Sequence, residues 1–197
     1  MKQFEEILKK SQSELQKFAD FVLKWQKTVN LIAPSTIPTI WERHIVDSAQ
    51  LFLYIPVDAK ILADMGSGGG FPAIVLAIIN KVVNGPIQCF YLIESDVKKS
   101  IFLREAARVF DLPVTVLNER LERVSLEKVD VVTARALKSV DELFELGQGI
   151  INSETVCLFL KGENVHEELK QNSHKCWVKI FPSITHDKGC VLKMRGV

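Results

Sequence analysis

The segment "LADMGSGGGFPAIVLA", residues 62–77, contains an acidic residue followed by four glycines within five positions, with apolar stretches on both sides. The acid is Asp64. Glycine has no Cβ, so a loop of this kind lets the backbone pass close to a ligand. An apolar strand, a glycine-rich turn and an apolar helix, in this order, predict a unit of an open α/β sheet with a ligand at the carboxyl end of the strand. The glycines are Gly66, Gly68, Gly69 and Gly70.

The rest of the chain after Pro56 has the pattern of a parallel sheet covered by helices, because short apolar runs alternate with helical stretches. The last two runs have little helix between them, so we expect an antiparallel pair there. We expect strands at Ile61–Ala63, Ile87–Ile93, Val114–Leu117, Val129–Thr133, Val156–Leu160, Cys176–Phe181 and Cys190–Lys193. We expect helices at Ala73–Ile79, Val97–Phe110, Val140–Leu146 and Val165–Lys170.

The N-terminal part is predicted to be helical. From Phe4 to Leu23 the apolar residues recur at helical spacing, with charged residues on the opposite face. A second helical stretch is expected between Pro38 and Tyr54. We therefore predict a helical extension over residues 1–56 and a sheet domain over residues 57–197, together forming one compact unit, since 197 residues suffice for one substantial core.

Composition indicates a soluble globular chain, with 47% hydrophobic and 25% charged residues. No apolar run approaches the roughly 20 residues of a membrane-spanning helix. The N-terminus lacks the apolar region of a signal peptide, so a cytoplasmic location is expected. The chain can bury its own core and shows no heptad seam, so a monomer is expected as well. The net charge of +1 means that any attraction to nucleic acid must come from a local patch.

The cysteines do not indicate a metal site. They are scattered, without a CxxC pair and without the Cys/His spacing of a zinc site, so we expect them to be reduced and mostly buried. They are Cys89, Cys157, Cys176 and Cys190.

Two carboxylates bear on the choice of ligand. The register from Gly68 to Ala73 matches GxGxxA, so a nicotinamide-dependent oxidoreductase is formally possible. Asp64 at the strand end repels a pyrophosphate and favours a cationic or hydroxyl-rich ligand. Glu94 ends the next expected strand, "CFYLIE", where an acceptor pair can hold a ribose diol; a purely structural salt bridge of Glu94 is the alternative. No Tyr/Lys or His/Asp proton relay accompanies the loop, which disfavours the oxidoreductase.

The pattern Asp-x-Gly-x-Gly-x-Gly at positions 64–70, with an acid at the end of the second strand, resembles motifs I and II of the class I S-adenosylmethionine-dependent methyltransferases. The resemblance implies a Rossmann-like, seven-stranded, mostly parallel α/β sheet with S-adenosyl-L-methionine as cofactor. In that family the glycine loop lies against the amino-acid part of the cofactor, and the acid binds the ribose hydroxyls. The implied cofactor-binding residues are Asp64, Gly66, Gly68, Gly70 and Glu94.

Further segments narrow the resemblance to one family. "WERHIVDS", "GSGGGFPA", "SDVKKSIFLREAA", "DVVTARAL" and "LFLKGEN" are similar, in order and spacing, to the bacterial small-subunit ribosomal RNA guanine-N7 methyltransferases, also called the glucose-inhibited division protein B family. The resemblance covers about residues 18–170. It implies methylation of nitrogen 7 of a guanine in the decoding-region loop of 16S ribosomal RNA, with that RNA or the small ribosomal subunit as the partner and no membrane.

The resemblance also implies roles for single residues. Gly66 and Phe71 would contact the cofactor, Leu121 and Glu122 would hold its adenine region, and Arg135 would lie at the edge between cofactor and substrate. Nitrogen 7 of guanine carries a lone pair and no proton, so the attack needs no general base and positioning is most of the task. A non-catalytic RNA-binding module of the same fold is the remaining alternative.

The target base must leave its stack to reach the methyl group, which predicts basic residues around the site. Arg135, Arg43 and Lys161 are the candidates for positioning the substrate. Arg43 has an alternative as a helical i, i+4 pair with Asp47. His44 is expected either in the site or as a hydrogen-bonded structural residue. Lys138 should also reach the rim, Arg120 and Arg123 should lie on the adenine side, and a solvated helix face is the preferred interpretation of Lys98, Lys99, Arg104 and Arg108.

Overall fold

The computed structural model describes residues 2–135, 138–171 and 177–195. Its centre is a seven-stranded sheet in the order β3-β2-β1-β4-β5-β7-β6. The first five strands in the sequence are parallel, and β7 runs antiparallel between β5 and β6. The strands are β1 (Ile61–Met65), β2 (Cys89–Ile93), β3 (Val114–Leu117), β4 (Val131–Arg135), β5 (Val156–Lys161), β6 (Trp177–Pro182) and β7 (Cys190–Arg195).

This arrangement confirms the α/β class, the mostly parallel seven-stranded sheet and the antiparallel pair at the C-terminus. Two strand starts were predicted too early. Ile87 precedes β2 because its backbone exchanges hydrogen bonds with the side chain of Asn80, at 3.0 and 2.9 Å. β4 begins at Val131 and extends through Arg135, so Arg135 is the last residue of the strand rather than a residue after it. Cys176, the predicted start of β6, lies outside the described residues.

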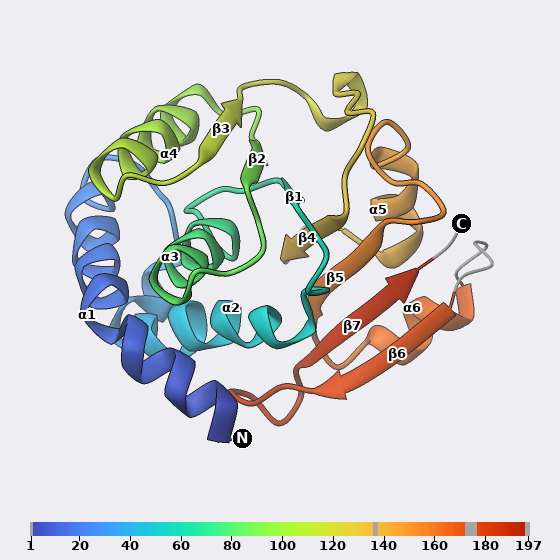
Figure 1. The fold of residues 1–197 in the computed structure, drawn as a ribbon, viewed down its shortest axis with the longest axis horizontal. Coiled ribbons are helices and arrows are strands. Elements are labelled where there is room, and N and C mark those ends of the chain that lie inside the picture. Colours follow the sequence, from blue (N-terminus) through green and yellow to red (C-terminus); the bar gives the residue numbers. More distant parts are fainter. Residues whose placement is uncertain (1, 136–137, 172–176, 196–197) are drawn as a thin grey trace.

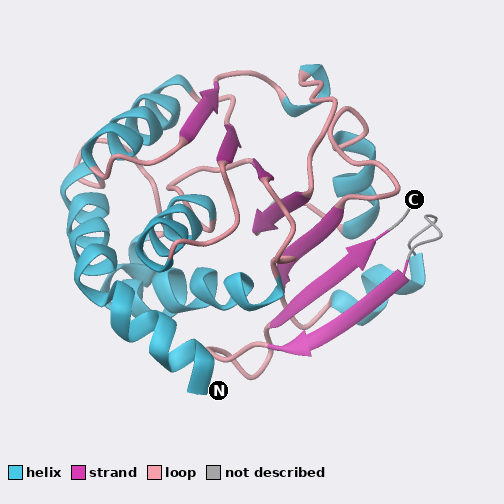
Figure 2. Ribbon diagram, in the orientation of Figure 1, coloured by secondary structure: helices cyan, strands magenta, loops and turns pink. Residues whose placement is uncertain are grey.

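Helices cover both faces of the sheet (Figures 1 and 2). One hydrophobic cluster joins the N-terminal helices, α3 and α4 to one face, and a second cluster joins α5 and α6 to the other. The α-helices are α1 (Lys2–Trp25), α2 (Asp47–Ala49), α3 (Ala73–Val83), α4 (Val97–Val109), α5 (Val140–Leu146) and α6 (Val165–Gln171). The other helical segments are η1 (Pro34–Thr39), η2 (Trp41–Val46), η3 (Gln50–Tyr54) and η4 (Leu121–Arg123).

Local sequence accounts for several helix boundaries. The side chain of Asp96 accepts a hydrogen bond from the backbone of Lys99 at the start of α4, and Ser139 with Glu142 forms a capping box at the start of α5. α3 runs beyond its predicted end to Val83 and stops at Asn84, which has φ 51°. Asparagine is one of the few residues that adopts this left-handed conformation readily, so it ends the helix.

The N-terminal segment is helical, as predicted, but the second stretch is not one regular helix. It passes from π-helical turns in η2 through α2 to the 3₁₀ turns of η3. Single π turns are frequent at functional sites, and this one carries Arg43 and His44. Among the helices of the described residues, none has the length and hydropathy that a membrane crossing requires.

α1 packs into the same core as the sheet. Phe18 is fully buried, and its ring centroid lies 5.5 Å from that of Phe71 in the glycine-loop region and 5.8 Å from that of Phe110 at the end of α4. The extension therefore supports the loop from behind. The boundary between an extension and a sheet domain at residue 56 stays a prediction.

Of the described cysteines, Cys157 and Cys190 are buried and Cys89 is half-buried. Cys176 lies outside the described residues.

Replacing Phe18 with alanine should lower the free energy of unfolding by about 3–5 kcal/mol, because the cavity opens between three elements. Phe18→Leu should cost clearly less. Urea unfolding followed by circular dichroism measures both variants. A loss below about 1 kcal/mol for Phe18→Ala would mean that α1 does not share the core of the sheet.

Candidate functional site

The glycine loop connects β1 to α3 at the carboxyl end of the sheet. Gly66, Gly68 and Gly70 have φ angles of 70°, 51° and 82°, the left-handed region that favours glycine. The backbone N–H groups of Gly66 and Ser67 donate to the carbonyl of Ile93 at 3.0 and 3.1 Å, which ties the loop to the end of β2.

The glycines of the loop serve different purposes. A Cβ on Gly69 would lie 2.9 Å from the carbonyl oxygen of Leu31, and one on Gly70 would lie 2.7 Å from Cγ1 of Ile74. These two positions are therefore required for packing against the protein itself. A Cβ on Gly68 would meet nothing closer than 3.8 Å, so this position leaves space for a ligand.

Asp64 is buried at the end of β1. Its Oδ1 accepts a hydrogen bond of 2.6 Å from the hydroxyl of Thr133 on β4, and its Oδ2 is buried without a hydrogen-bond partner among the described residues. Burial raises the pKa of Asp64 to about 6, against the hydrogen bond from Thr133, which lowers it. An unsatisfied buried acceptor is costly, so Oδ2 is an atom that a donor or cation on a ligand would stabilise.

Glu94 follows β2 directly and is also nearly buried. One carboxylate oxygen accepts from the N–H of Gly68 and the other from the N–H of Asp96, both at 2.8 Å. In the part of the chain that the structure describes, Glu94 forms no ion pair, so the salt-bridge alternative is wrong. Each oxygen still has a free lone-pair site, and two such sites side by side suit a vicinal diol.

These two carboxylates test the fit of S-adenosylmethionine. The cofactor carries a sulfonium and an ammonium cation and a ribose diol, but no phosphate. The unpartnered Oδ2 of Asp64 fits a cationic donor, the remaining acceptor sites of Glu94 fit the diol, and the space above Gly68 admits the cofactor. The residues present therefore fit S-adenosylmethionine.

Arg135 lies between the glycine loop and the N-terminal extension. Its guanidinium carbon is 5.8 Å from the centre of the Phe71 ring, and Nη2 donates to the carbonyl of Arg43 at 2.7 Å. Nε lies 3.7 Å from Oδ2 of Asp47, and Nη1 is buried without a hydrogen-bond partner among the described residues. Burial lowers the pKa of Arg135 from its usual value, but arginine remains charged at physiological pH.

Asp47 is the ion-pair partner of Arg135, so the alternative of a helical pair between Arg43 and Asp47 is wrong. Arg43 contributes its carbonyl to Arg135 and its side chain to a cavity. The carboxylate of Asp47 also holds the turn between β6 and β7, because its Oδ1 accepts from the hydroxyl of Thr185 at 2.9 Å and from the side chain of Gln50 at 2.9 Å.

His44 has the structural role that was one of the two expectations. Its Nε2 is 2.7 Å from the hydroxyl of Thr36, and its ring packs 4.9 Å from the ring of Phe71. Burial, together with the positive charges of Arg135 and Arg43, lowers the pKa of His44 to about 3. The imidazole is therefore neutral at physiological pH.

A cavity of about 460 Å³ opens beside Arg135 at the ends of β4 and β5. Lys161 lies on its wall and is fixed by Glu168 and the carbonyl of Lys138, each at 2.6 Å. The volume lies within the usual range for small-molecule sites. The other lining residues are Arg43, Asp47, Leu160, Gly162, Glu163, Asn164, Glu168, His186, Lys188, Gly189 and Cys190.

Several predicted residues lie outside this cavity. Leu121 and Glu122 form the short helix η4 after β3, with Leu121 half-buried and Glu122 exposed; their contact with an adenine stays a prediction. Lys138 is bound to Glu142, and Arg123 lies 3.6 Å from Glu119. Arg120 is exposed and not part of the cavity wall.

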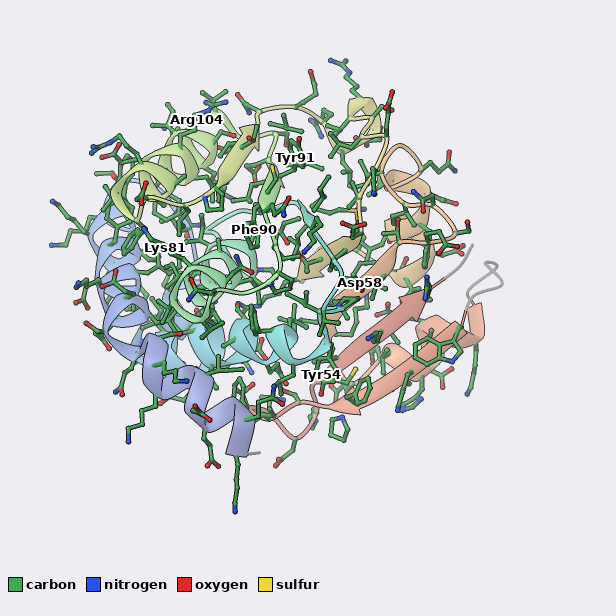
Figure 3. All side chains as sticks on the ribbon, in the orientation of Figure 1. Tyr54, Asp58, Lys81, Phe90, Tyr91 and Arg104 are labelled. Carbon is green, nitrogen blue, oxygen red and sulfur yellow. The ribbon has the colours of Figure 1, made fainter. Side chains whose placement is uncertain are left out.

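The basic residues of α4 also lie outside the cavity. Lys98, Arg104 and Arg108 are solvent-exposed, with Arg108 paired to Glu105, and Lys99 is half-buried. Figure 3 shows Arg104 on the outer side of α4.

The sequence interpretation missed three parts of the site. Thr133 holds Asp64, Asp47 and Thr185 connect Arg135 to the β6–β7 turn, and that turn supplies His186 and Lys188 to the cavity. Thr133 could have been found from the sequence, because its hydroxyl interrupts the apolar run of β4. The connection through Asp47 had none, since it joins residues more than 130 positions apart.

The strand order, the glycine loop and the two acids at the strand ends define a class I S-adenosylmethionine-dependent methyltransferase. Solved structures of this fold agree. A SAM-dependent methyltransferase from Aquifex aeolicus superposes with a TM-score of 0.60 at 15% identity, over 83% of this chain and 98% of that one. The ribosomal protein L11 methylase from Lactobacillus delbrueckii gives 0.59 at 14% identity, over 77% of each chain. At these identities the likeness concerns the fold alone.

Sequence relatives identify the family. The family model GidB, rRNA small subunit methyltransferase G, matches residues 11–189. Ribosomal RNA small subunit methyltransferase G from Paramagnetospirillum magneticum is 43% identical over 98% of this chain and 95% of its own. The protein of the same name from Dinoroseobacter shibae is 41% identical over 93% of this chain and 95% of its own. The chain belongs to the rRNA small subunit methyltransferase G family.

This membership confirms the resemblance inferred from the sequence and decides against the nicotinamide-dependent oxidoreductase. The chain is an enzyme, and its cofactor is S-adenosylmethionine.

Asp64→Asn should make the cofactor-free protein more stable above about pH 6. The pKa of Asp64 is raised from 3.8 to about 6 in the folded protein. The protonated carboxyl therefore favours the folded state fully below the pKa of the unfolded chain, and this contribution to stability is lost as the pH rises through 6. The neutral amide of asparagine carries no charge to bury, so above pH 6 the free energy of unfolding of the variant should exceed that of the wild type by up to about 3 kcal/mol. Urea unfolding between pH 4 and 8 measures it, with the exposed Asp58→Asn (Figure 3) as control. If the difference in free energy of unfolding between Asp64→Asn and Asp58→Asn does not grow with pH, the wild-type protein does not bury a charge at Asp64.

Proposed function

We propose that this enzyme transfers the methyl group of S-adenosylmethionine to nitrogen 7 of a guanine in 16S ribosomal RNA, acting as a cytoplasmic monomer on the RNA or the small subunit. The names of the relatives support a ribosomal RNA substrate. The observation that carries the proposal is the position of Arg135. It contacts the glycine-loop residue Phe71 on one side and lines the 460 Å³ cavity on the other, so it adjoins both cofactor and substrate.

The residues of the site suit a reaction that needs positioning more than proton transfer. When bound, S-adenosylmethionine supplies an electrophilic methyl group. Nitrogen 7 of guanine has no proton to lose, so no side chain has to act as a base. His44, a buried imidazole beside the glycine loop, is hydrogen-bonded to Thr36 and packs on Phe71, which fits a structural role.

We assign the roles of the site residues accordingly. Asp64 and Glu94 hold and orient the cofactor from the ends of neighbouring strands, with Gly66, Gly68 and Gly70 shaping the loop between them. Arg135, with Arg43 and Lys161 on the cavity wall, orients the RNA and the entering base. Fixed charges aimed into a partly enclosed site are effective because they need no rearrangement during the reaction. Phe71 would contact the cofactor, and Leu121 with Glu122 would border its adenine.

Deletion of the gene should remove one 7-methylguanosine from 16S ribosomal RNA. Mass-spectrometric mapping of modified nucleosides, in cells with and without the gene, measures this. Complementation with the wild-type gene should restore the modification, and Arg135→Ala should restore little of it. An unchanged profile after deletion would refute the assignment.

Asp47→Asn should lower kcat/KM for the RNA about tenfold, because Arg135 loses its ion-pair partner. Affinity for S-adenosylmethionine, measured by calorimetry, should change less than twofold. Thr185→Val is the matched control, since it removes a donor to Asp47 and leaves the charge facing Arg135. Equal losses in both variants would mean that Asp47 acts by holding the β6–β7 turn rather than by positioning Arg135.

A further inference from the structure

The two outer strands β6 and β7 present a basic and aromatic face on the side of the sheet opposite α6. The strand register places Trp177 opposite Arg195, Lys179 opposite Lys193, and Phe181 opposite Val191. Directly opposed residues of an antiparallel pair point to the same side, so these side chains share one face. We call this set the outer-strand face.

The other face of the same strands is covered. Val178, Ile180, Leu192 and Met194 pack into the cluster that contains α5 and α6. The N-terminal extension covers the end of the outer-strand face near Val191, which is fully buried, and the ring of Tyr54 lies 4.4 Å from that of Phe181. Figure 3 labels Tyr54. In Figure 1 no described helix crosses in front of β6 and β7. The part of this face formed by Trp177, Lys179 and Arg195 is exposed and therefore open to a partner.

The charges on this face are arranged unfavourably in the isolated protein. Lys179 and Lys193 are cross-strand neighbours of like charge, which destabilises a strand pair. Among the described residues neither forms an ion pair; Lys193 donates to the carbonyl of Tyr54 at 3.0 Å, and Lys179 lies 5.0 Å from the Phe181 ring centre. The pKa of Lys193 is lowered by partial burial and then by the positive charges of Lys179 and Arg195. An anion bound between the strands would relieve this repulsion.

An aromatic residue lies beside these charges. Trp177 is 55% exposed, which is unusual for a residue with so large an apolar group. It borders a hollow of about 530 Å³ together with Lys193 and Arg195. Arg195 pairs with Glu154 at 2.8 Å, but both side chains are more than half exposed, so this pair is weak and exchangeable. Exposed aromatic rings next to cations are the combination with which proteins bind single-stranded nucleic acid.

We propose that the outer-strand face binds the ribosomal RNA substrate outside the methylation site, with phosphates at Lys179 and Lys193 and an unstacked base on Trp177. This inference rests on the proposed function, since it takes the partner to be RNA. The net charge of +1 supplies almost no general attraction, so a local cluster of unpaired cations is needed for binding. The hollow at Trp177 lies at the far end of β7 from Cys190, which lines the cavity beside Arg135, so the RNA would extend along the strand pair from the methylation site.

Lys179→Glu tests the proposal without threatening the fold. A glutamate opposite Lys193 replaces a repulsive pair with an attractive one, so the melting temperature should not fall. Affinity for deproteinised 16S ribosomal RNA should drop about tenfold near 0.1 M salt, and the dependence of log affinity on log salt should become shallower by about 1. Trp177→Ala should weaken binding by roughly tenfold. Filter binding measures each affinity, and Lys9→Glu, the same charge change on the exposed face of α1, is the control.

The possible results separate the proposals. If Lys179→Glu and Lys9→Glu bind the RNA equally well, the outer-strand face is not an RNA site, and the lysines serve only to keep the sheet edge from pairing with other chains. If Lys179→Glu loses affinity for intact subunits but not for naked RNA, the face meets a protein and the RNA assignment is overturned. Methylation by the wild-type enzyme is followed in the same samples, so failure of the proposed function appears as absence of product whatever the variant binds.

Discussion

The geometry of the cofactor site depends on the hydrogen bonds that join the end of β2 to the glycine loop. The carbonyl of Ile93 accepts two N–H groups of the loop, and the carboxylate of Glu94 accepts the N–H of Gly68. These bonds fix backbone that has no side chains to anchor it and keep Asp64 buried behind it. The same carboxylate retains acceptor capacity for a ligand, so the contact that orders the loop also forms part of the cofactor site.

Burial of Asp64 lowers the stability of the cofactor-free protein and favours the binding of a cationic ligand. Its pKa is raised to about 6, and one of its oxygens has no partner in the described protein. Such a carboxylate weakens the cofactor-free fold at neutral pH and is stabilised when a cation arrives. Active sites commonly retain groups of this kind, because a charge already desolvated interacts strongly with its ligand.

The N-terminal extension and the C-terminal hairpin meet at the substrate side of the site. Asp47 from the extension faces Arg135 of β4 and accepts from Thr185 of the hairpin turn. Arg43 adds its carbonyl to Arg135. The parallel strands supply the cofactor loop, whereas the extension and the antiparallel hairpin shape the cavity where the RNA base would enter. Specificity for one RNA can therefore reside in these two segments rather than in the parallel strands.

The sequence alone was enough for the fold class, the glycine loop, both strand-end acids and the family, because each depends on local patterns: alternating apolar runs, positive φ at glycine, and an acid directly after a strand. It did not show that Asp47 pairs with Arg135 instead of Arg43, that Gly69 and Gly70 are needed for packing, or that Lys179 faces Lys193. Those features are contacts between distant positions, such as Arg135 with Arg43, 92 residues apart. Only the tertiary structure decides them, because side chains so far apart in sequence become neighbours through packing of the sheet and its helices, which no local spacing encodes.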